Sequence, residues 1–307
     1  MNLSQLREAF ARREISKPDY IEQMYRHHGL LHEYAEFIKG TEVSGIEITD
    51  GRVVMTVRET GLRLVCAPGD RRLAPLEMLN FGAYERDYMD ACLALIDPGA
   101  VVWDVGANIG WYALTLARRR PGLRILSFEP IPGTFQALTE NVRLNGEAGV
   151  RCLDFGLSDR EAVQTFYFYP EGSANASAAD LSGREGVRQL SCRVRRLDDF
   201  AREEGLRADF IKCDIEGAEL FALRGGRETI CRDHPVIFAE MLRKWSARFD
   251  YHPDDIIALL AELGYRCFRL EAGRLAECPK VDEATADTNF FFLHPQSHSA
   301  KLKALSR

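Results

Sequence analysis

The 307-residue sequence lacks any long stretch without charged residues. The two longest stretches free of Asp, Glu, Lys and Arg span residues 105–117 and 288–300, 13 residues each, whereas a membrane-spanning helix needs about 20 apolar residues. The first 20 residues carry Arg7, Glu8 and Arg12 with no apolar core between them, so we expect no secretory signal. The sequence therefore predicts no integral membrane segment and a cytoplasmic protein.

The sequence also lacks an excess of positive charge and any close pair of cysteines. Forty basic residues against 46 acidic ones give a formal net charge of -6, which argues against a protein that mainly binds a phosphate backbone. We therefore expect no nucleic-acid partner. The eight cysteines are separated by at least 11 residues and form no CxxC pair, which disfavours a zinc ribbon or a redox dithiol.

The spacing of apolar residues changes along the chain and predicts three regions. Residues 1–83 form an extension of two helices and a β-hairpin that turns at Asp50-Gly51. In residues 84–295, strands alternate with helices, which is typical of a parallel sheet. Residues 296–307 form a polar tail.

Within residues 84–295, one segment departs from the alternation of strands and helices, and the last two strands are predicted to be antiparallel. Residues 157–196 depart from the alternation and are predicted to form an insertion or flap of two strands over the sheet. Residues 217–230 and 253–263 are predicted to be helices, and two late strands at 265–270 and 289–293 are expected to pair as a closing antiparallel hairpin.

A strand that runs into a glycine turn is the most informative feature. Gly106 and Gly110 follow the apolar strand 101–105 and precede a predicted helix, so the backbone of this turn can approach a nucleotide-like cofactor closely. A dinucleotide fingerprint GxGxxG would need a glycine where this chain has Asn108. Asp104 places a carboxylate beside the turn, which would repel a pyrophosphate but suit a sulfonium. This favours S-adenosylmethionine over NAD.

Two further strand ends carry candidate cofactor contacts. Glu129 ends the second strand, 19 residues after Gly110, a spacing that suits a carboxylate accepting hydrogen bonds from both ribose hydroxyls. The third strand ends near Phe155 and Gly156, where an adenine could stack or form hydrogen bonds.

Three separated strings resemble the FkbM-type family of S-adenosylmethionine-dependent methyltransferases. They are the segment WDVGANIGWY within residues 101–112, Phe128-Glu129-Pro130, and IKCDIEGAE at residues 211–219. Looser matches at Tyr84-Glu85 and 235–240 extend the resemblance over about residues 80 to 245.

The resemblance implies a fold, a cofactor and a reaction. It implies an α/β fold with a class I methyltransferase (Rossmann-like) sheet, mostly parallel with a C-terminal antiparallel hairpin, plus the small N-terminal α+β extension. It adds Glu85, Ala107, Pro130 and Asp214 to the candidate residues for S-adenosylmethionine. Family members mostly methylate hydroxyls on sugars, glycolipids or natural products, which implies a glycan or small-molecule acceptor.

Carboxylates at the ends of two later strands are the candidate catalytic groups. Asp214 lies at the carboxyl end of the fourth strand, where open α/β sheets bind ligands, and we predict it to be the general base. Glu216 and Glu240 are predicted to lie beside it and share the catalytic role. Glu219 falls one turn into a helix and is expected to be structural.

This group of acids has three interpretations. It can be a general base with hydrogen-bond partners for sugar hydroxyls, an oxygen-ligand site for Mg²⁺ or Ca²⁺, or acids that favour a helix dipole. We favour the first and predict no metal site. His27, His28 and His32 have no completing ligand set, and His252 is expected to lie in a solvated loop.

The arginines of the insertion are a further candidate. Arg193 and Arg195 share one strand face and could meet an anionic group on the acceptor, although a solvated face is the favoured interpretation; the nearby arginines are Arg184, Arg188 and Arg196.

The sequence favours an O-methyltransferase and leaves other functions open. The alternatives are an N-methyltransferase, a NAD-dependent oxidoreductase and a nucleotide-binding module without catalysis. The fourth strand is followed by Asp-Ile-Glu-Gly at 214–217 rather than by an Asn-Pro-Pro-Tyr type loop, which argues against methylation of nitrogen. The acceptor and the oligomeric state have no readable signal in the sequence.

Overall fold

The computed structural model describes residues 1–169, 177–179 and 187–305. The helices are α1 (Leu3–Ala11), α2 (Lys17–Phe37), α3 (Ala74–Phe81), α4 (Arg86–Leu95), α5 (Trp111–Arg119), α6 (Pro132–Asn145), α7 (Leu197–Glu204), α8 (Glu219–Gly225), α9 (Arg227–Asp233), α10 (Arg243–Ser246), α11 (Pro253–Glu262) and α12 (Ser299–Leu305), with 3-10 turns η1 (Ile38–Gly40) and η3 (Ala247–Phe249). The strands are β1 (Val43–Thr49), β2 (Arg52–Val57), β3 (Arg63–Cys66), β4 (Val101–Val105), β5 (Arg124–Phe128), β6 (Val150–Leu153), β7 (Gly156–Ser158), β8 (Ala162–Phe168), β9 (Arg188–Arg196), β10 (Phe210–Cys213), β11 (Val236–Glu240), β12 (Arg266–Glu271), β13 (Arg274–Glu277) and β14 (Asn289–Leu293).

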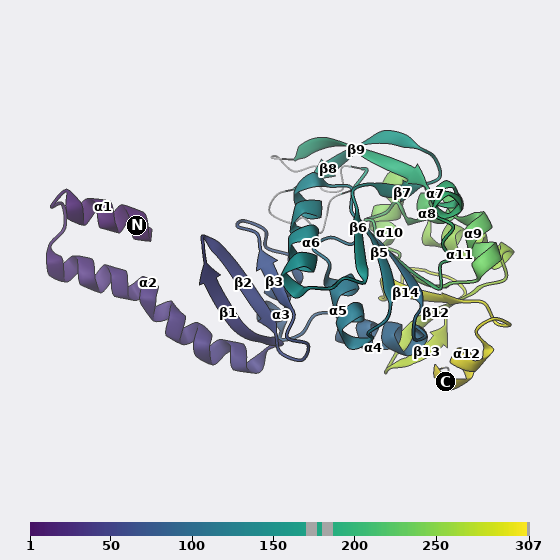
Figure 1. The fold of residues 1–307 in the computed structure, drawn as a ribbon, viewed down its shortest axis with the longest axis horizontal. Helices are drawn as coiled ribbons and strands as arrows, with labels where there is room; N and C mark the ends of the chain where they lie inside the picture. Colours follow the sequence, from purple (N-terminus) through teal and green to yellow (C-terminus); the bar gives the residue numbers. More distant parts are fainter. Residues whose placement is uncertain (170–176, 180–186, 306–307) are drawn as a thin grey trace.

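The central sheet of the described residues has eight strands in the order β6-β5-β4-β10-β11-β14-β12-β13. Figure 1 labels β6, β5, β14, β12 and β13 of this sheet. The strands from β6 to β11 are parallel, whereas β14 is antiparallel to β11 and β12 is antiparallel to β14. The chain order reverses between β4 and β10, and open α/β sheets bind ligands at such a switch point, outside the carboxyl ends of the strands. The prediction of a mostly parallel α/β fold is confirmed.

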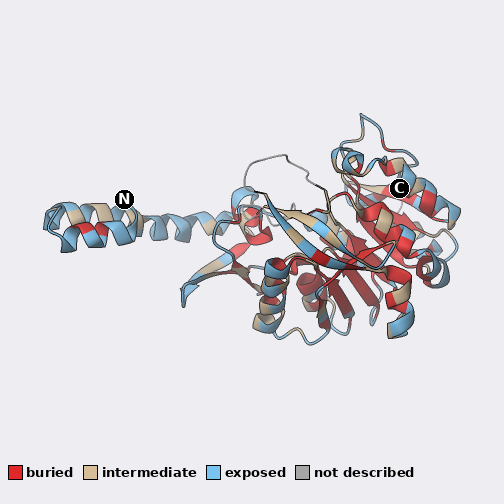
Figure 2. Ribbon diagram, turned by 90° about the horizontal axis from the view of Figure 1, so that it is seen from above, coloured by how far each residue is buried: buried red, intermediate tan, exposed pale blue. Residues whose placement is uncertain are grey.

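The sheet is buried on both faces because its strands are almost entirely apolar. In β4, Val102 faces a core that also contains residues of α3, α4 and α5, whereas Val101, Trp103 and Val105 face a core built from α7, α8, α9 and α11. Burial on two sides explains the continuous apolar runs of these strands, and Figure 2 shows the buried sheet at the centre of the molecule.

Two smaller sheets flank the central one. Strands β1, β2 and β3 form an antiparallel sheet with its first turn at Asp50-Gly51, and its buried side chains, such as Met55 and Leu64, join the α3–α5 core. The insertion forms a sheet in the order β7-β9-β8, in which the two predicted strands are present as β8 and β9 and pair antiparallel. The parts of the insertion at 170–176 and 180–186, including Arg184, lie outside the described residues.

The structure corrects three details of the sequence-based predictions. The helix predicted at 217–230 is two helices, α8 and α9, separated at Gly226. The preceding residue has to be glycine, because a Cβ at Gly225 would lie 1.9 Å from the carbonyl oxygen of Ser158. The predicted antiparallel pairing of the two late strands is confirmed as β12 with β14. They do not form a hairpin, because β13 follows β12 in the chain and pairs with its other edge. Helix α3 had no predicted counterpart.

The end of the chain contains a helix. In the segment predicted as a polar tail, α12 places Leu302 and Leu305 against the core on the α3–α5 side. None of the described helices is both long and apolar enough to cross a membrane.

Candidate active site

A cavity of about 310 Å³ lies at the switch point of the sheet, beyond the carboxyl ends of β4, β5, β10 and β11. Most of the predicted site residues line it, namely Glu85, Gly106, Ala107, Asn108, Glu129, Pro130, Asp214, Glu216 and Glu240. Aromatic and basic side chains complete the wall, among them Tyr84, Tyr112, Phe166, Lys212, Lys244 and Trp245. The structure therefore brings together candidates from five separate segments of the chain.

Glu129 is held in place by two backbone amides. The amides of Asn108 and Ile131 donate to its Oε2 and Oε1 at 3.0 and 2.9 Å. Burial raises the pKa of this carboxyl to about 7, although the two amide hydrogen bonds stabilise the ionised carboxylate and act to lower the pKa. Its oxygens keep free lone pairs that can accept hydrogen bonds from a ligand in the cavity. The Oδ1 atom of Asn108, also at the cavity wall, is buried and has no hydrogen-bond partner among the described residues.

The two glycines of the turn serve different contacts. Gly106 has φ +79°, and a Cβ there would lie 1.9 Å from the carbonyl oxygen of Asp214. The loop after β10 therefore excludes any side chain at this position. Gly110 has φ +93° and does not line the cavity; a Cβ there would lie 2.8 Å from Leu138 of α6. Gly110 therefore allows the start of α5 to approach α6.

Asp104 lies beneath the turn and does not reach the cavity. It is fully buried, and it pairs in register with Lys212 on β10. The Lys212 ammonium lies 3.5 Å from Asp104 Oδ1 and 3.5 Å from Asp214 Oδ2, and it donates to the carbonyl oxygen of Gly106 at 2.8 Å. Burial alone would lower the pKa of Lys212, but the carboxylates of Asp214, Asp104 and Glu85 raise it above its ordinary value.

Three carboxylates meet at one end of the cavity. Asp214, Glu216 and Glu240 each offer an oxygen within 4.8 Å of the others. Burial, and then the negative charge of Asp214, raises the pKa of Glu216 and of Glu240 well above the ordinary value. Oxygen atoms at this spacing could also hold a hard cation such as Mg²⁺. The prediction that the site works without a metal is untested.

Three cavity residues adopt a left-handed backbone conformation. Glu85, Asn108 and Glu216 have φ values of +49°, +48° and +54°. Asparagine adopts this conformation readily, but for the two glutamates it costs about 1–2 kcal/mol each. Residues in such conformations cluster at binding sites, where the surrounding structure holds them.

Glu85 reaches the cavity from the turn before α4. The Tyr112 hydroxyl donates to its Oε2 at 2.8 Å, and burial together with the charge of Asp214 raises the pKa of the Glu85 carboxyl. The two side chains link the start of α4 to α5 beside the cavity.

Glu219 organises the loop that carries two of the catalytic candidates. Its Oε1 accepts hydrogen bonds from the amides of Ile215 and Gly217 at 2.9 and 3.0 Å, and its Oε2 accepts from the Tyr251 hydroxyl at 3.2 Å. Burial raises the pKa of this carboxyl to about 7. Its contacts are all within the chain, and it does not line the cavity.

The insertion contacts the same loop. Ser177 pairs with Tyr167 of β8 through two backbone hydrogen bonds, and its hydroxyl donates to the carbonyl oxygen of Glu216 at 2.7 Å. The insertion is therefore attached to the backbone of the carboxylate cluster.

The two adenine candidates at the end of β6 fall in different places. Phe155 is buried among Phe128, Phe200 and Arg195, and it does not line the cavity. Gly156 lines a smaller hollow of about 120 Å³, which shares Gly106, Pro130, Phe166 and Ile215 with the main cavity.

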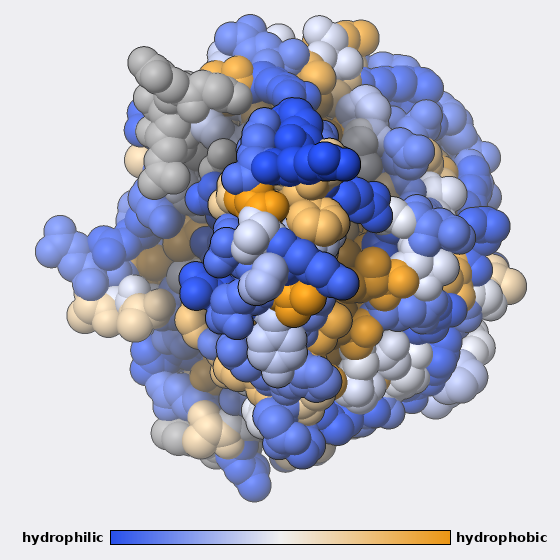
Figure 3. All heavy atoms as spheres, turned by 90° about the vertical axis from the view of Figure 1, so that its left-hand side faces the viewer, coloured by the Kyte–Doolittle hydropathy of each residue, from blue (hydrophilic) through white to orange (hydrophobic). Residues whose placement is uncertain are grey.

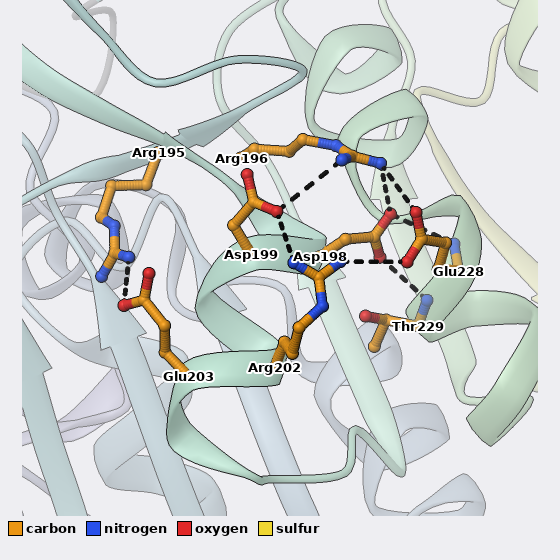
Figure 4. Close-up of polar contacts among 8 residues, drawn as sticks. All are labelled: Arg195, Arg196, Asp198, Asp199, Arg202, Glu203, Glu228 and Thr229. Atoms are coloured by element: carbon orange, nitrogen blue, oxygen red, sulfur yellow. Dashed lines mark hydrogen bonds and ion pairs between the residues drawn. The ribbon is translucent and has the colours of Figure 1, made fainter.

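Arginines in the described part of the insertion form ion pairs with acidic side chains of this chain (Figure 4). Arg195 points toward Glu203 at 2.5 Å, and Arg196 points toward Asp199 and Glu228. These acids lie on α7 and α9. Arg196 also pairs with Asp198 at 3.2 Å, and Arg193 pairs with Glu161 at 2.8 Å. None of these side chains lines the cavity, so they give no support to an anion-binding role.

The histidines lie outside the cavity. His27, His28 and His32 are on α2, and the His252 side chain accepts a hydrogen bond from the amide of Asp254 and caps α11. The expected solvated loop at His252 is instead the N-cap of a helix.

Four residues that line the cavity are not among the predicted site residues, namely Lys212, Tyr84, Tyr112 and Trp245. A lysine inside an otherwise apolar strand was the available signal, because a buried ammonium requires acidic partners. The tyrosines and the tryptophan had no such signal.

Comparisons with known proteins find similar sequences over the central part of the chain. The family model described as "Methyltransferase FkbM domain" matches residues 104–267. Methyltransferase 1 of Beauveria bassiana is 30% identical over 158 residues, which is 45% of this chain and 64% of that protein. The 31-O-demethyl-FK506 methyltransferase FkbM of Streptomyces tacrolimicus is 30% identical over 174 residues, 46% of this chain and 66% of that protein. The 2-O-methyltransferase NoeI of Sinorhizobium fredii is 31% identical over 153 residues, 44% and 60% of the two chains.

These matches span less than two thirds of each relative's own length. Among solved structures, a methyltransferase FkbM from Methylobacillus flagellatus KT aligns with 64% of this chain and 44% of that chain, with 19% identity and a TM-score of 0.42.

Proposed function

Because this chain belongs to the FkbM methyltransferase family, which the sequence resemblance predicted, we propose that it transfers the methyl group of S-adenosylmethionine to a hydroxyl of a sugar or a glycosylated small molecule. One observation carries the proposal: a single cavity has Glu129 and the Gly106 turn in one part of its wall and the carboxylates of Asp214, Glu216 and Glu240 in another. A cofactor site and a proton-accepting site thus share one enclosed space.

The residues around the Gly106 turn fit the cofactor. The anchored carboxylate of Glu129 can accept hydrogen bonds from both ribose hydroxyls, and the unpartnered Oδ1 of Asn108 can accept one from a ligand donor. The smaller hollow beside Gly156 has apolar walls that include Leu157 and Phe221, which suits the adenine.

The bound cofactor would supply a methyl group already activated by its positive sulfur. The chain's own residues then have to orient the acceptor hydroxyl and remove its proton. Asp214 accepts this proton, because it directly follows β10 at the cavity and Lys212, 3.5 Å from its Oδ2, holds its side chain in place. Glu216 and Glu240, whose carboxyls retain protons more strongly, form hydrogen bonds with the acceptor oxygens.

The wall of the cavity supports a sugar-like acceptor. Trp245 and Phe166 offer aromatic faces beside three carboxylates, a combination that can contact the apolar and hydroxyl-bearing sides of a sugar ring. The relatives NoeI and FkbM, by their names, are O-methyltransferases, in agreement with transfer to oxygen.

Calorimetric titration with S-adenosylhomocysteine and, separately, with NAD tests the cofactor assignment. We expect binding of the first only, and at least about tenfold weaker binding by Glu129→Ala, because one or more charge-assisted hydrogen bonds are lost. Glu161→Ala, which removes an exposed acid outside the cavity, is the matched control and should bind normally.

A screen of hydroxylated glycans for a gain of one methyl mass then tests the reaction. Binding of NAD alone, or equal affinity of Glu129→Ala and the wild type, would contradict the cofactor site. Methyl transfer to amines but not to hydroxyls would contradict the acceptor class.

A further inference from the structure

Helix α2 is unusual because none of its 21 residues is buried. With α1 it forms an arm that projects from the β1-β2-β3 sheet, away from the rest of the molecule (Figures 1 and 2). A helix in water normally depends on the burial of one face for its stability. The arm therefore has a face that the described part of this chain leaves uncovered.

Helix α1 covers only the outer half of α2. It packs Leu6 and Ala9 against this half, and Phe10 stacks on Tyr20 with ring centres 4.5 Å apart. At the other end of α1, the carbonyl oxygen of Met1 lies 3.1 Å from His27 Nε2. Since α1 has nine residues, it is about 14 Å long against about 31 Å for α2.

The apolar face continues beyond the end of α1. Tyr20, Met24 and His27 lie under α1 and are partly buried. Leu31 and Tyr34 follow on the same side of the helix at the spacing of one to two turns. Leu31 and Tyr34 are 58% and 46% exposed. The neighbouring side chains of Leu30 and Phe37 are 46% and 54% exposed.

A second feature of the sequence indicates what covers this face. The residues Ile21, Met24, His28, Leu31, Ala35 and Ile38 are spaced 3, 4, 3, 4 and 3 apart, which is a heptad repeat. The repeat is self-complementary in an antiparallel pair of α2 helices, where one register sets Met24 opposite Ala35 and His28 opposite Leu31, while Ile38, in η1, packs against the core of the main domain. The α1-covered half of one α2 then lies beside the uncovered half of the other.

We propose that the arm is a dimerisation element whose partner is the arm of a second copy of this chain. The two α2 helices pair antiparallel, and each α1 covers the exposed half of the partner's α2. The unburied side chains are sufficient for this interface: Leu3, Phe10, Ile21, Tyr25, Leu30, Leu31, Tyr34 and Phe37 are 37–62% exposed. Together they offer on the order of 800 Å² per copy, the area that each partner buries in a stable complex.

The charges of the arm favour a protein partner over a membrane. Helix α2 carries Asp19, Glu22, Glu33 and Glu36 against Lys17 and Arg26. Amphipathic helices that bind anionic lipid surfaces have polar faces rich in Lys and Arg. Figure 3, viewed from the side on which the arm projects, shows hydrophobic side chains exposed among hydrophilic ones on that face.

Light scattering coupled to gel filtration of the full chain tests the proposal. We expect twice the chain mass of 34.7 kDa for the wild type and the single-chain mass for Leu31→Asp/Tyr34→Asp, with association weakened at least about 100-fold. Glu22→Ala/Glu33→Ala changes the charged side of the same helix and should remain a dimer. Because no α2 residue is buried, an unchanged thermal midpoint of the Leu31→Asp/Tyr34→Asp variant would show that its main domain is intact.

Three outcomes would overturn the proposal. The wild type could run at the single-chain mass, or Leu31→Asp/Tyr34→Asp could remain a dimer, which would place the interface elsewhere. A single-chain wild type that sediments with phosphatidylserine vesicles, and loses this with the two aspartates, would identify a membrane surface as the occupant instead.

Discussion

At the scale of single residues, Lys212 balances the charges beneath the site. It is buried in β10 and lies 3.5 Å from the carboxylates of both Asp104 and Asp214. Asp104 has no hydrogen-bond partner in the described structure, so the ammonium is its source of compensation. Removing the ammonium leaves a fully buried carboxyl without an opposite charge, which is among the most costly changes in a protein interior.

We expect Lys212→Met to lower the free energy of unfolding by about 3–5 kcal/mol, measured by urea denaturation. The double variant Lys212→Met/Asp104→Asn should recover part of this loss, because it removes the stranded carboxyl. If the single variant is as stable as the wild type, or if the double variant is less stable than the single one, Lys212 does not compensate Asp104.

Asp214 is the residue whose replacement should separate binding from chemistry. For Asp214→Asn we expect turnover to fall by about 10² or more with near-normal affinity for S-adenosylhomocysteine, because the general base is lost while the Glu129 contact remains. The acidic limb of any residual pH–rate profile should move to lower pH, since the negative charge of Asp214 contributes to the raised pKa of Glu216 and Glu240. Normal turnover would assign the proton transfer to another group.

At the scale of elements, the loop between β10 and α8 depends on the buried carboxyl of Glu219. Its pKa rises from 4.5 to about 7 on folding because of burial. The folded chain thus binds this proton more tightly than the unfolded chain. The resulting stabilisation is complete below pH 4.5 and is lost as the pH rises through about 7.

Glu219→Gln keeps an oxygen for the amides of Ile215 and Gly217 and removes the titration. Between pH 4.5 and 7 the wild type should lose about 3 kcal/mol of unfolding free energy that the variant does not lose. Urea unfolding of both proteins across this range measures the difference, and parallel curves would show that the carboxyl is already ionised in the folded chain at low pH. Asp154→Asn, an exposed acid after β6, serves as the control.

Elements defined by local patterns could be predicted from the sequence, whereas those defined by packing could not. Strand β4 and the turn at Gly106 were predictable because an apolar run, glycines and a helix start are contiguous. The close approach of Gly225 to the backbone of Ser158 was not, because the two residues lie 67 positions apart in the chain.

The residues of the candidate site also divide into those that a local pattern predicts and those whose position depends on packing. Glu129, Asp214 and Glu240 follow apolar strands directly, and parallel strands bring their carboxyl ends to one edge. The burial of Phe155 depends on its contact with α7, and the pairing of Lys212 with Asp104 depends on β10 lying beside β4. Both depend on long-range topology, which no local pattern of residues encodes.

At the scale of the whole molecule, the arm and the catalytic region are separate in their packing. Helix α2 buries no residue, and the core on the α3–α5 side begins to include this part of the chain only at Ile38. Removal of residues 1–37 should leave the affinity for S-adenosylhomocysteine within about twofold, because the buried residues of this segment, Leu6 and Ala9, pack between α1 and α2 and not against the site. Calorimetry on the truncated chain measures this, and a chain that fails to fold or to bind would show that the arm supports the core.

The contact between Gly106 and the carbonyl oxygen of Asp214 constrains how this protein can be redesigned. A single added carbon at position 106 would collide with the backbone that carries the proposed base, so a library aimed at new acceptors should leave both positions unchanged. Phe166, Lys244 and Trp245 line the same cavity from other segments. Randomising these three positions would alter the acceptor wall while preserving the junction between β4 and β10, and directed evolution of acceptor range should start there.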